Sequence, residues 1–105
     1  MNETTIRGTV HFVDEVREYG ANGFRKHEVV IKTGDEKWPN PIPVEFIKDS
    51  IENSTRLSVG QEVEIKCRVN GREWEKDGVI RYFVSVQGME ITFLTEAAET
   101  GDAPF

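Results

Sequence analysis

The chain has few of the residues that build covalent or metal-based sites. Its 105 residues include one cysteine, Cys67, and two histidines, His11 and His27. A single cysteine cannot form an internal disulfide and leaves no Cys cluster to hold zinc. The histidines lie far apart, without the Asp and Ser spacing of a catalytic triad and without a third metal ligand. We therefore expect two surface histidines, no catalytic residue, no metal and no cofactor.

Long apolar runs are also absent. No stretch approaches the roughly 20 apolar residues of a membrane helix, and the first residues, Met1 to Thr4, are polar and acidic, unlike a signal peptide. The sequence therefore predicts a cytoplasmic protein with no membrane partner. Its length leaves room for one core, so we expect one domain over residues 1–94 and a flexible acidic tail over residues 95–105.

The net charge of −6 opposes binding of a polyanion. Three of the 19 acidic residues lie in residues 96–105, which leaves 16 acidic and 13 basic residues before them. Nucleic-acid binding would therefore need a separate basic face. The acids gather in short clusters along the chain, which permits such a face. These clusters are residues 14–18, 35–36, 49–52 and 62–64.

Apolar residues at every second position predict five strands. In the first strand, Phe12 falls on the same side of the alternation as the core residues. Gly8 in this strand indicates a bend or a close backbone approach. Residues 47–53 carry one or two helical turns between the third and fourth strands. This order predicts an all-β fold, a five-stranded OB-fold Greek-key barrel with a short helix between strands 3 and 4. An SH3-like barrel remains the alternative. The expected strands are residues 6–12, 24–33, 42–46, 62–69 and 80–87.

The second half of the chain gives more local predictions. Asn70-Gly71 is expected to break the fourth strand, and residues 72–78 are expected to form a loop. In the last long strand, Ile80, Tyr82, Val84 and Val86 alternate with polar or outward residues, so we expect all four in the core.

Cations and aromatic rings suited to a single-stranded nucleic acid lie on the predicted outward faces and loops. Cations neutralise phosphates, and rings provide stacking surfaces for bases. Trp74 has a second interpretation as a cap on the open end of the barrel, and Trp38 as a structural or oligomer contact. Phe83 is an outward aromatic that could mark a dimer interface. The predicted nucleic-acid-binding residues are Phe24, Arg25, Lys26, Lys32, Trp38, Arg68, Arg72, Trp74, Lys76 and Arg81.

The final residues have the chemistry of a docking peptide. Phe105 offers an apolar anchor with a free carboxylate, and Pro104 lowers the backbone entropy cost of binding. Asp102 and the terminal carboxylate suit a basic rim on a partner. The predicted partner-binding tail is Asp102, Ala103, Pro104 and Phe105; a frayed polar terminus is the plain alternative.

Three stretches, Gly23–Ile31, Leu57–Val63 and Asn70–Trp74, resemble a family of short bacterial OB-fold proteins of unassigned function. More loosely, they resemble the DNA-binding domains of single-stranded DNA-binding proteins. The terminal Asp-x-Pro-Phe resembles the acidic tip of bacterial and phage members of that class.

This resemblance implies a non-catalytic, sequence-independent single-stranded DNA-binding protein of replication, recombination or repair, in a bacterial cell or a phage-infected host. It implies that the tip recruits replication or repair proteins. We also expect a homodimer, because one small barrel can neutralise few phosphates. The alternative from another class is an OB or SH3-like adaptor that binds proteins through its acidic surface and does not bind nucleic acid.

Overall fold

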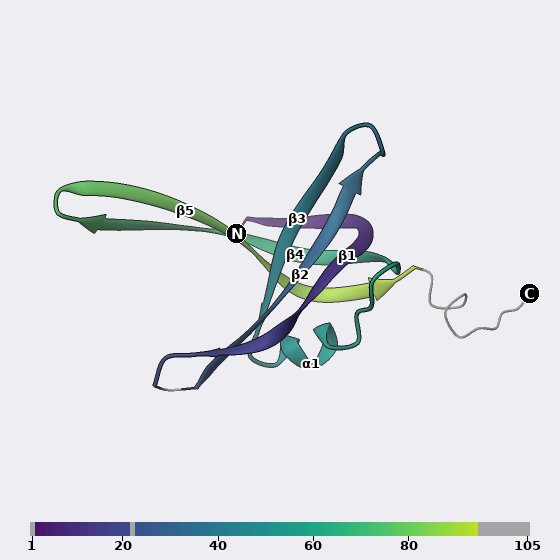
Figure 1. Cartoon of the computed structure of the whole chain (residues 1–105), viewed down its shortest axis with the longest axis horizontal. Coiled ribbons are helices and arrows are strands. Elements are labelled where there is room, and N and C mark those ends of the chain that lie inside the picture. Colours follow the sequence, from purple (N-terminus) through teal and green to yellow (C-terminus); the bar gives the residue numbers. More distant parts are fainter. Residues whose placement is uncertain (1, 22, 95–105) are drawn as a thin grey trace, which may run out of the picture.

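The computed structural model describes residues 2–21 and 23–94. These residues form a closed barrel in the order β1-β2-β3-β5-β4, which confirms the all-β OB-fold and its short helix between β3 and β4 (Figure 1). The predicted tail, with Asp102 to Phe105, lies outside the described residues. Neither described range holds a helix long and apolar enough to cross a membrane. The elements are β1 (Glu3–Tyr19), β2 (Phe24–Gly34), β3 (Pro39–Ile47), α1 (Ser50–Ser54), β4 (Glu62–Lys76) and β5 (Val79–Phe93).

The barrel closes because β1 changes its pairing partner along its length. Residues 3–9 of β1 pair with β4, and residues 9–19 pair with β2. Gly8 lies at this corner, where a Cβ atom would meet the backbone carbonyl of Lys32. The close backbone approach predicted for Gly8 is therefore confirmed. On the other side, β3 and β5 close the barrel through one parallel pair, Glu45 with Gln87.

The core follows the alternating pattern of β2 and β4. Val29 and Ile31 on β2, and Val63 and Ile65 on β4, are fully buried, as the sequence predicts. Phe46 on β3 is the largest of the fully buried side chains, and Ile51 of α1 is buried in the same cluster. Burial of these apolar side chains is the main favourable term in folding.

Phe12 does not follow the predicted pattern. A register shift between Val10 and Phe12 interrupts the pairing of β1 with β2. Val10 is buried, whereas Phe12 is 52% exposed and Val13 packs against the core instead. A bulge adds one residue to one strand and so reverses the faces of the residues that follow it.

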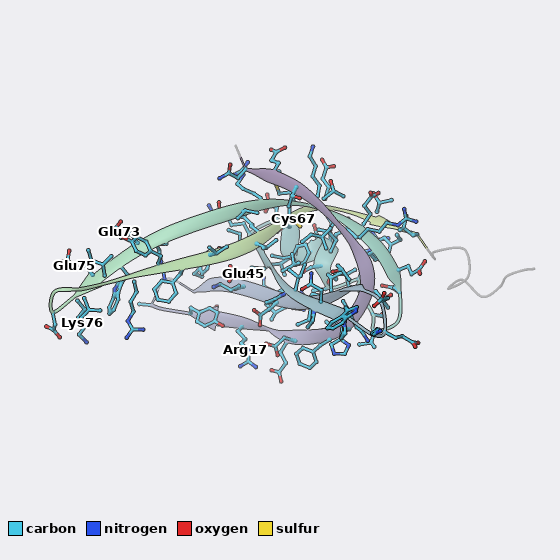
Figure 2. The ribbon with its side chains drawn as sticks, turned by 90° about the horizontal axis from the view of Figure 1, so that it is seen from above. Arg17, Glu45, Cys67, Glu73, Glu75 and Lys76 are labelled. Carbon is cyan, nitrogen blue, oxygen red and sulfur yellow. The ribbon has the colours of Figure 1, made fainter. Side chains whose placement is uncertain are left out.

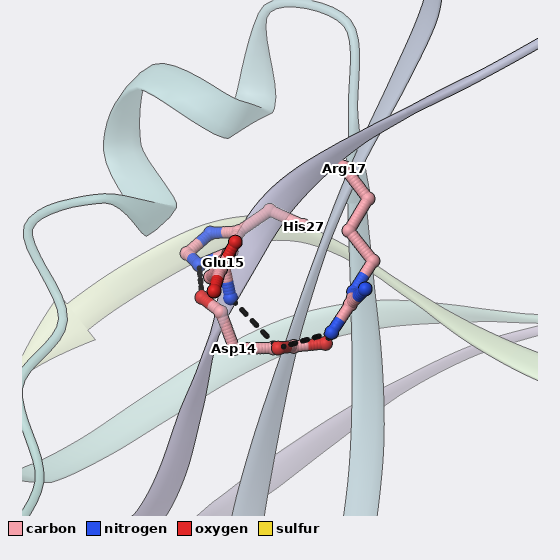
Figure 3. A network of polar contacts seen from close by, with 4 residues as sticks. All are labelled: Asp14, Glu15, Arg17 and His27. Carbon is pink, nitrogen blue, oxygen red and sulfur yellow. Dashed lines mark hydrogen bonds and ion pairs between the residues drawn. The ribbon is translucent and has the colours of Figure 1, made fainter.

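His27 is buried, so its predicted surface position is wrong. Its Nε2–H donates to the carbonyl of Asp14 at 2.8 Å (Figure 3), and its Nδ1 lies 2.7 Å from Oγ of Ser54 on α1. The ring therefore joins β1, β2 and α1 with both nitrogens satisfied, as a buried polar group requires. In the same cluster, hydrogen bonds from Arg17 and from the Glu15 backbone N–H lower the pKa of Asp14.

The β4–β5 hairpin differs most from the prediction. Strand β4 continues through Asn70-Gly71 to Lys76, and its pairing with β5 is continuous from Cys67–Gly88 to Lys76–Val79. Residues 72–78 are therefore not a loop. Asp77 and Gly78 alone connect the strands, both with positive φ (54° and 79°). This is the requirement of a two-residue type I′ turn, which favours the Asp-Gly sequence.

The core assignment of Ile80, Tyr82 and Val84 is wrong. The hairpin extends beyond the barrel, so these side chains have no opposing layer (Figure 1). Tyr82 and Val84 are each 73% exposed, and Ile80 is also exposed. Only Val86, nearer the barrel, packs against the core.

Gly88 provides a test of the barrel's packing. A Cβ atom at Gly88 would overlap the ring of Phe46, whereas Gly71, on the same pair of strands, has open space around it. We expect Gly88→Ala to lower the free energy of unfolding by about 1–3 kcal/mol, because Phe46 must leave its position. Gly71→Ala is the matched control and is expected to be neutral or slightly stabilising. Urea unfolding measures both; equal effects would contradict this packing.

Candidate nucleic-acid interface

The projecting part of the β4–β5 hairpin is the most distinctive feature of the surface. We call residues 68–76 of β4 and 79–87 of β5 the arm. Figure 1 shows it leaving the barrel to one side, away from the β2–β3 hairpin. Its register fixes which side chains share a face, because directly opposed residues of an antiparallel pair point to the same side.

One face of the arm carries cations and rings and no carboxylate. From the barrel outward, the opposed pairs are Arg68–Gln87, Asn70–Ser85, Arg72–Phe83, Trp74–Arg81 and Lys76–Val79. We call these ten residues the basic face. Trp74 is 44% exposed and Phe83 46%, so both rings are accessible for stacking. Five of the ten predicted binding residues lie here: Arg68, Arg72, Trp74, Lys76 and Arg81.

The opposite face combines acidic and apolar residues. Its pairs are Val69–Val86, Gly71–Val84, Glu73–Tyr82 and Glu75–Ile80. We call it the acidic face. Figure 2 shows Glu73 and Glu75 above the ribbon of the arm and Lys76 below it. Alternation along the two strands therefore separates positive from negative charge across the thickness of one ribbon.

A groove of about 420 Å³ lies where the arm meets the barrel. Arg72 and Phe83 contribute to it from the arm, and Lys26 and Glu45 from the barrel. The Arg72 guanidinium lies 5.8 Å from the centroid of the Phe83 ring. Nζ of Lys26 lies 3.6 Å from Oε2 of Glu45 and 5.4 Å from the centroid of the Tyr19 ring. Lys26 is thus brought beside the basic face from a distant part of the sequence.

Arg68 is at the barrel end of the basic face, opposite Glu3 of β1, and its Nε is buried with no hydrogen-bond partner among the described residues. Two further predicted residues, Phe24 and Arg25, lie at the start of β2. Phe24 is exposed on the outward side of β2, in the same alternation as Lys26. Arg25 has the other parity and opposes Glu18, so it is turned away from Lys26.

Two predicted residues, Lys32 and Trp38, lie apart from the basic face and its groove. Lys32 lines a separate cavity of about 530 Å³ together with His11, Asp35 and Glu36. This cavity is the larger of the two, but its two carboxylates make it a poor site for phosphate. Trp38 is 73% exposed at the β2–β3 turn, where its backbone N–H donates to Asp35.

The prediction from sequence missed the continuous pairing of β4 with β5 along the arm and the position of Phe83 on the basic face. The signal was present: Asp77-Gly78 between two alternating segments is a strong hairpin pattern. With this pair as the hairpin turn, Arg72, Trp74 and Lys76 fall on a strand. Glu45 in the groove had no comparable local signal, because it reaches the arm only through the closure of the barrel.

The part of the chain that the structure describes offers little support for metal binding or for a cysteine nucleophile. No group of three or more His, Cys, Asp or Glu residues there could hold a metal ion. Cys67 is buried in the barrel, and its desolvation raises the pKa of the thiol to about 11. The thiol therefore stays protonated at neutral pH, which makes it a poor nucleophile.

The fold and the surface together define an OB-fold protein with a two-faced β4–β5 arm. The chain belongs to the family described as a domain of unknown function (DUF3127), whose model matches residues 5–92. No protein with a curated description matches it. Among solved structures, it is similar to the mitochondrial single-stranded DNA binding protein Rim1 from S. cerevisiae, with a TM-score of 0.65 and 18% sequence identity. That match covers 89% of this chain and 94% of the other, and it supports the fold.

Glu45 offers a test of the groove. Its carboxylate pairs with Lys26 and would repel a phosphate there. If the groove lies on the path of a polyanion, we expect Glu45→Gln to raise affinity for oligo-dT by up to about fivefold, since a unit charge at 4 Å in water contributes about 1 kcal/mol. Glu52→Gln on α1 makes the same change in net charge away from the groove. Fluorescence anisotropy measures both, and an equal rise in the two variants would contradict this placement.

Proposed function

We propose that this protein binds single-stranded DNA without sequence preference, along the basic face of the arm and into the groove at its base. The observation that carries the proposal is the separation of charge on the arm. Arg68, Arg72, Lys76 and Arg81 share a face with Trp74 and Phe83, and that face has no carboxylate. This combination of backbone neutralisation and stacking surfaces is what single-stranded nucleic-acid binding requires.

The negative net charge is compatible with this function because the ten residues of the basic face include no carboxylate, although Glu45 lines the groove at its base and Glu3 opposes Arg68 at its barrel end. Glu73 and Glu75 point away from the basic face, and Asp35 and Glu36 line the other cavity. Screening at physiological salt limits repulsion over distances beyond about 8 Å. A bound strand would therefore be attracted mainly by the cations nearest to it.

The two tryptophans provide a matched test of this path. We expect Trp74→Ala to weaken binding of oligo-dT by about 5- to 150-fold, because removal of one base stack costs about 1–3 kcal/mol. Trp38→Ala removes the same side chain from the β2–β3 turn and is expected to change affinity by less than about twofold. Anisotropy titration of a labelled oligonucleotide measures both variants.

Either of two results would contradict the proposal. In the first, Trp38→Ala weakens binding as much as Trp74→Ala does. In the second, the unmodified protein leaves oligo-dT free at about 100 µM in physiological salt, near the limit of non-specific binding.

Salt dependence tests the cations separately from the rings. For a single strand, the slope of log K against log salt falls by about 0.7 for each phosphate that the protein no longer neutralises. We expect the double variant Arg72→Ala, Arg81→Ala to lower the slope by about 1.4, whereas Trp74→Ala leaves it nearly unchanged. A slope that stays constant in the double variant would show that these arginines do not neutralise phosphates.

The wider role proposed is non-catalytic coating of exposed strands in replication, recombination or repair. In this role Asp102 to Phe105 would dock partner proteins, and the sequence of that tip supports the assignment. Deletion of residues 96–105 should then abolish capture of a partner while leaving the arm intact.

The second candidate is a protein-binding adaptor, which the acidic face and the net charge of −6 favour. An adaptor would capture a protein partner after nuclease treatment and would not shift an oligonucleotide.

A further inference from the structure

The arm has two open edges, and they differ in chemistry. Strand β5 pairs with β3 only at Glu45–Gln87, and β4 pairs with β1 only as far as Arg68–Glu3. Beyond these points, within the described residues, neither outer edge has a neighbouring strand. Figure 1 shows the arm diverging from the β2–β3 hairpin.

The β4 edge is protected and the β5 edge is not. Residues 72–76 of β4 read Arg-Glu-Trp-Glu-Lys, and charged residues are a common means of blocking edge-to-edge pairing. Residues 79–86 of β5 read Val-Ile-Arg-Tyr-Phe-Val-Ser-Val, with one charge and mostly β-branched or aromatic residues. Such a segment on an open edge is a template for another strand.

We propose that two copies of this protein pair through the β5 edges of their arms, antiparallel and around a two-fold axis centred on Tyr82. Such an axis stands perpendicular to the sheet, so it opposes residues of the same parity and keeps each face on its own side. The result is a four-stranded sheet in the order β4-β5-β5-β4.

The sequence around Tyr82 is self-complementary in this register. Tyr82 opposes Tyr82 of the second copy, and Ile80 opposes Val84 on the same face. On the basic face, Arg81 opposes Phe83 of the second copy, and the two-fold axis produces this pair twice. Opposed aromatic and β-branched pairs stabilise a sheet, and a cation beside a ring adds to this.

Neighbouring registers are worse. Centring the axis on Arg81 would oppose two arginines, and like charges directly opposite are destabilising. Centring it on Phe83 would oppose two phenylalanines but place Arg81 opposite Ser85, so both pairs of an arginine with a ring would be lost. The side chains thus select one register as well as one edge.

This pairing also has a consequence for the proposed function. Both basic faces lie on one side of the four-stranded sheet, which doubles the number of cations and rings presented to one strand. The pairing itself does not require DNA, and the test below is made without an oligonucleotide. Its failure is therefore distinct from a failure of DNA binding.

Cysteine cross-linking tests the register. Opposed residues of an antiparallel pair have Cα atoms about 4.5–5.5 Å apart, within the range of a disulfide. We expect Tyr82→Cys to give a covalent dimer under mild oxidation. Glu73→Cys, on the same face but on β4, is the control: three strand spacings, about 14 Å, would separate its two copies. Native Cys67 is buried and should not react.

Sedimentation velocity on uncross-linked protein gives an independent measurement. We expect the unmodified protein to form a concentration-dependent dimer, and Tyr82→Lys to weaken that dimer at least tenfold by opposing two charges at the axis. Glu73→Lys should leave it unchanged. Tyr82 is 73% exposed, so its replacement should not unfold the protein. A monomer at all concentrations, or equal cross-linking of Glu73→Cys and Tyr82→Cys, would overturn the proposal.

Discussion

Continuous pairing of β4 with β5 is the constraint on which the account of this surface depends. The ladder runs without interruption from Cys67–Gly88 to the Asp77-Gly78 turn. Its register assigns every arm residue to one of two faces, because side chains alternate strictly along a strand. A shift of one residue in one strand would mix Glu73 and Glu75 with the cations. The type I′ turn therefore determines which residues share each face of the arm as well as the path of the chain.

Much of the fold could be predicted from the sequence because the barrel's core strands are locally regular. Val29 and Ile31 on β2, and Val63 and Ile65 on β4, are buried as their parity requires. The alternation of side chains along a strand cannot show where the barrel ends, however. Tyr82 and Val84 have the alternation of a core strand, and only the absence of an opposing layer exposes them. The exposed fraction of a side chain is thus a property of the tertiary arrangement that a local pattern does not contain.

The same limit applies to the candidate site. Residue type predicts Arg72, Trp74, Lys76 and Arg81 as binding residues, and the register places them on one face. Whether they bind DNA stays a prediction. Lys32 and Trp38 are candidates on the same grounds but lie elsewhere. Residue type thus identifies candidates, whereas the hairpin register and the barrel closure decide which of them are neighbours. His27 shows the same effect in the core, since its partners come from β1 and α1.

The most direct test follows the two indole N–H resonances of the protein by NMR during titration with oligo-dT. The chain has two tryptophans, Trp38 at the β2–β3 turn and Trp74 on the basic face. If DNA lies along the arm, the Trp74 resonance shifts or broadens with added oligonucleotide and the Trp38 resonance does not. A shift of Trp38 alone, or no change in either resonance at saturating oligonucleotide, would contradict the account.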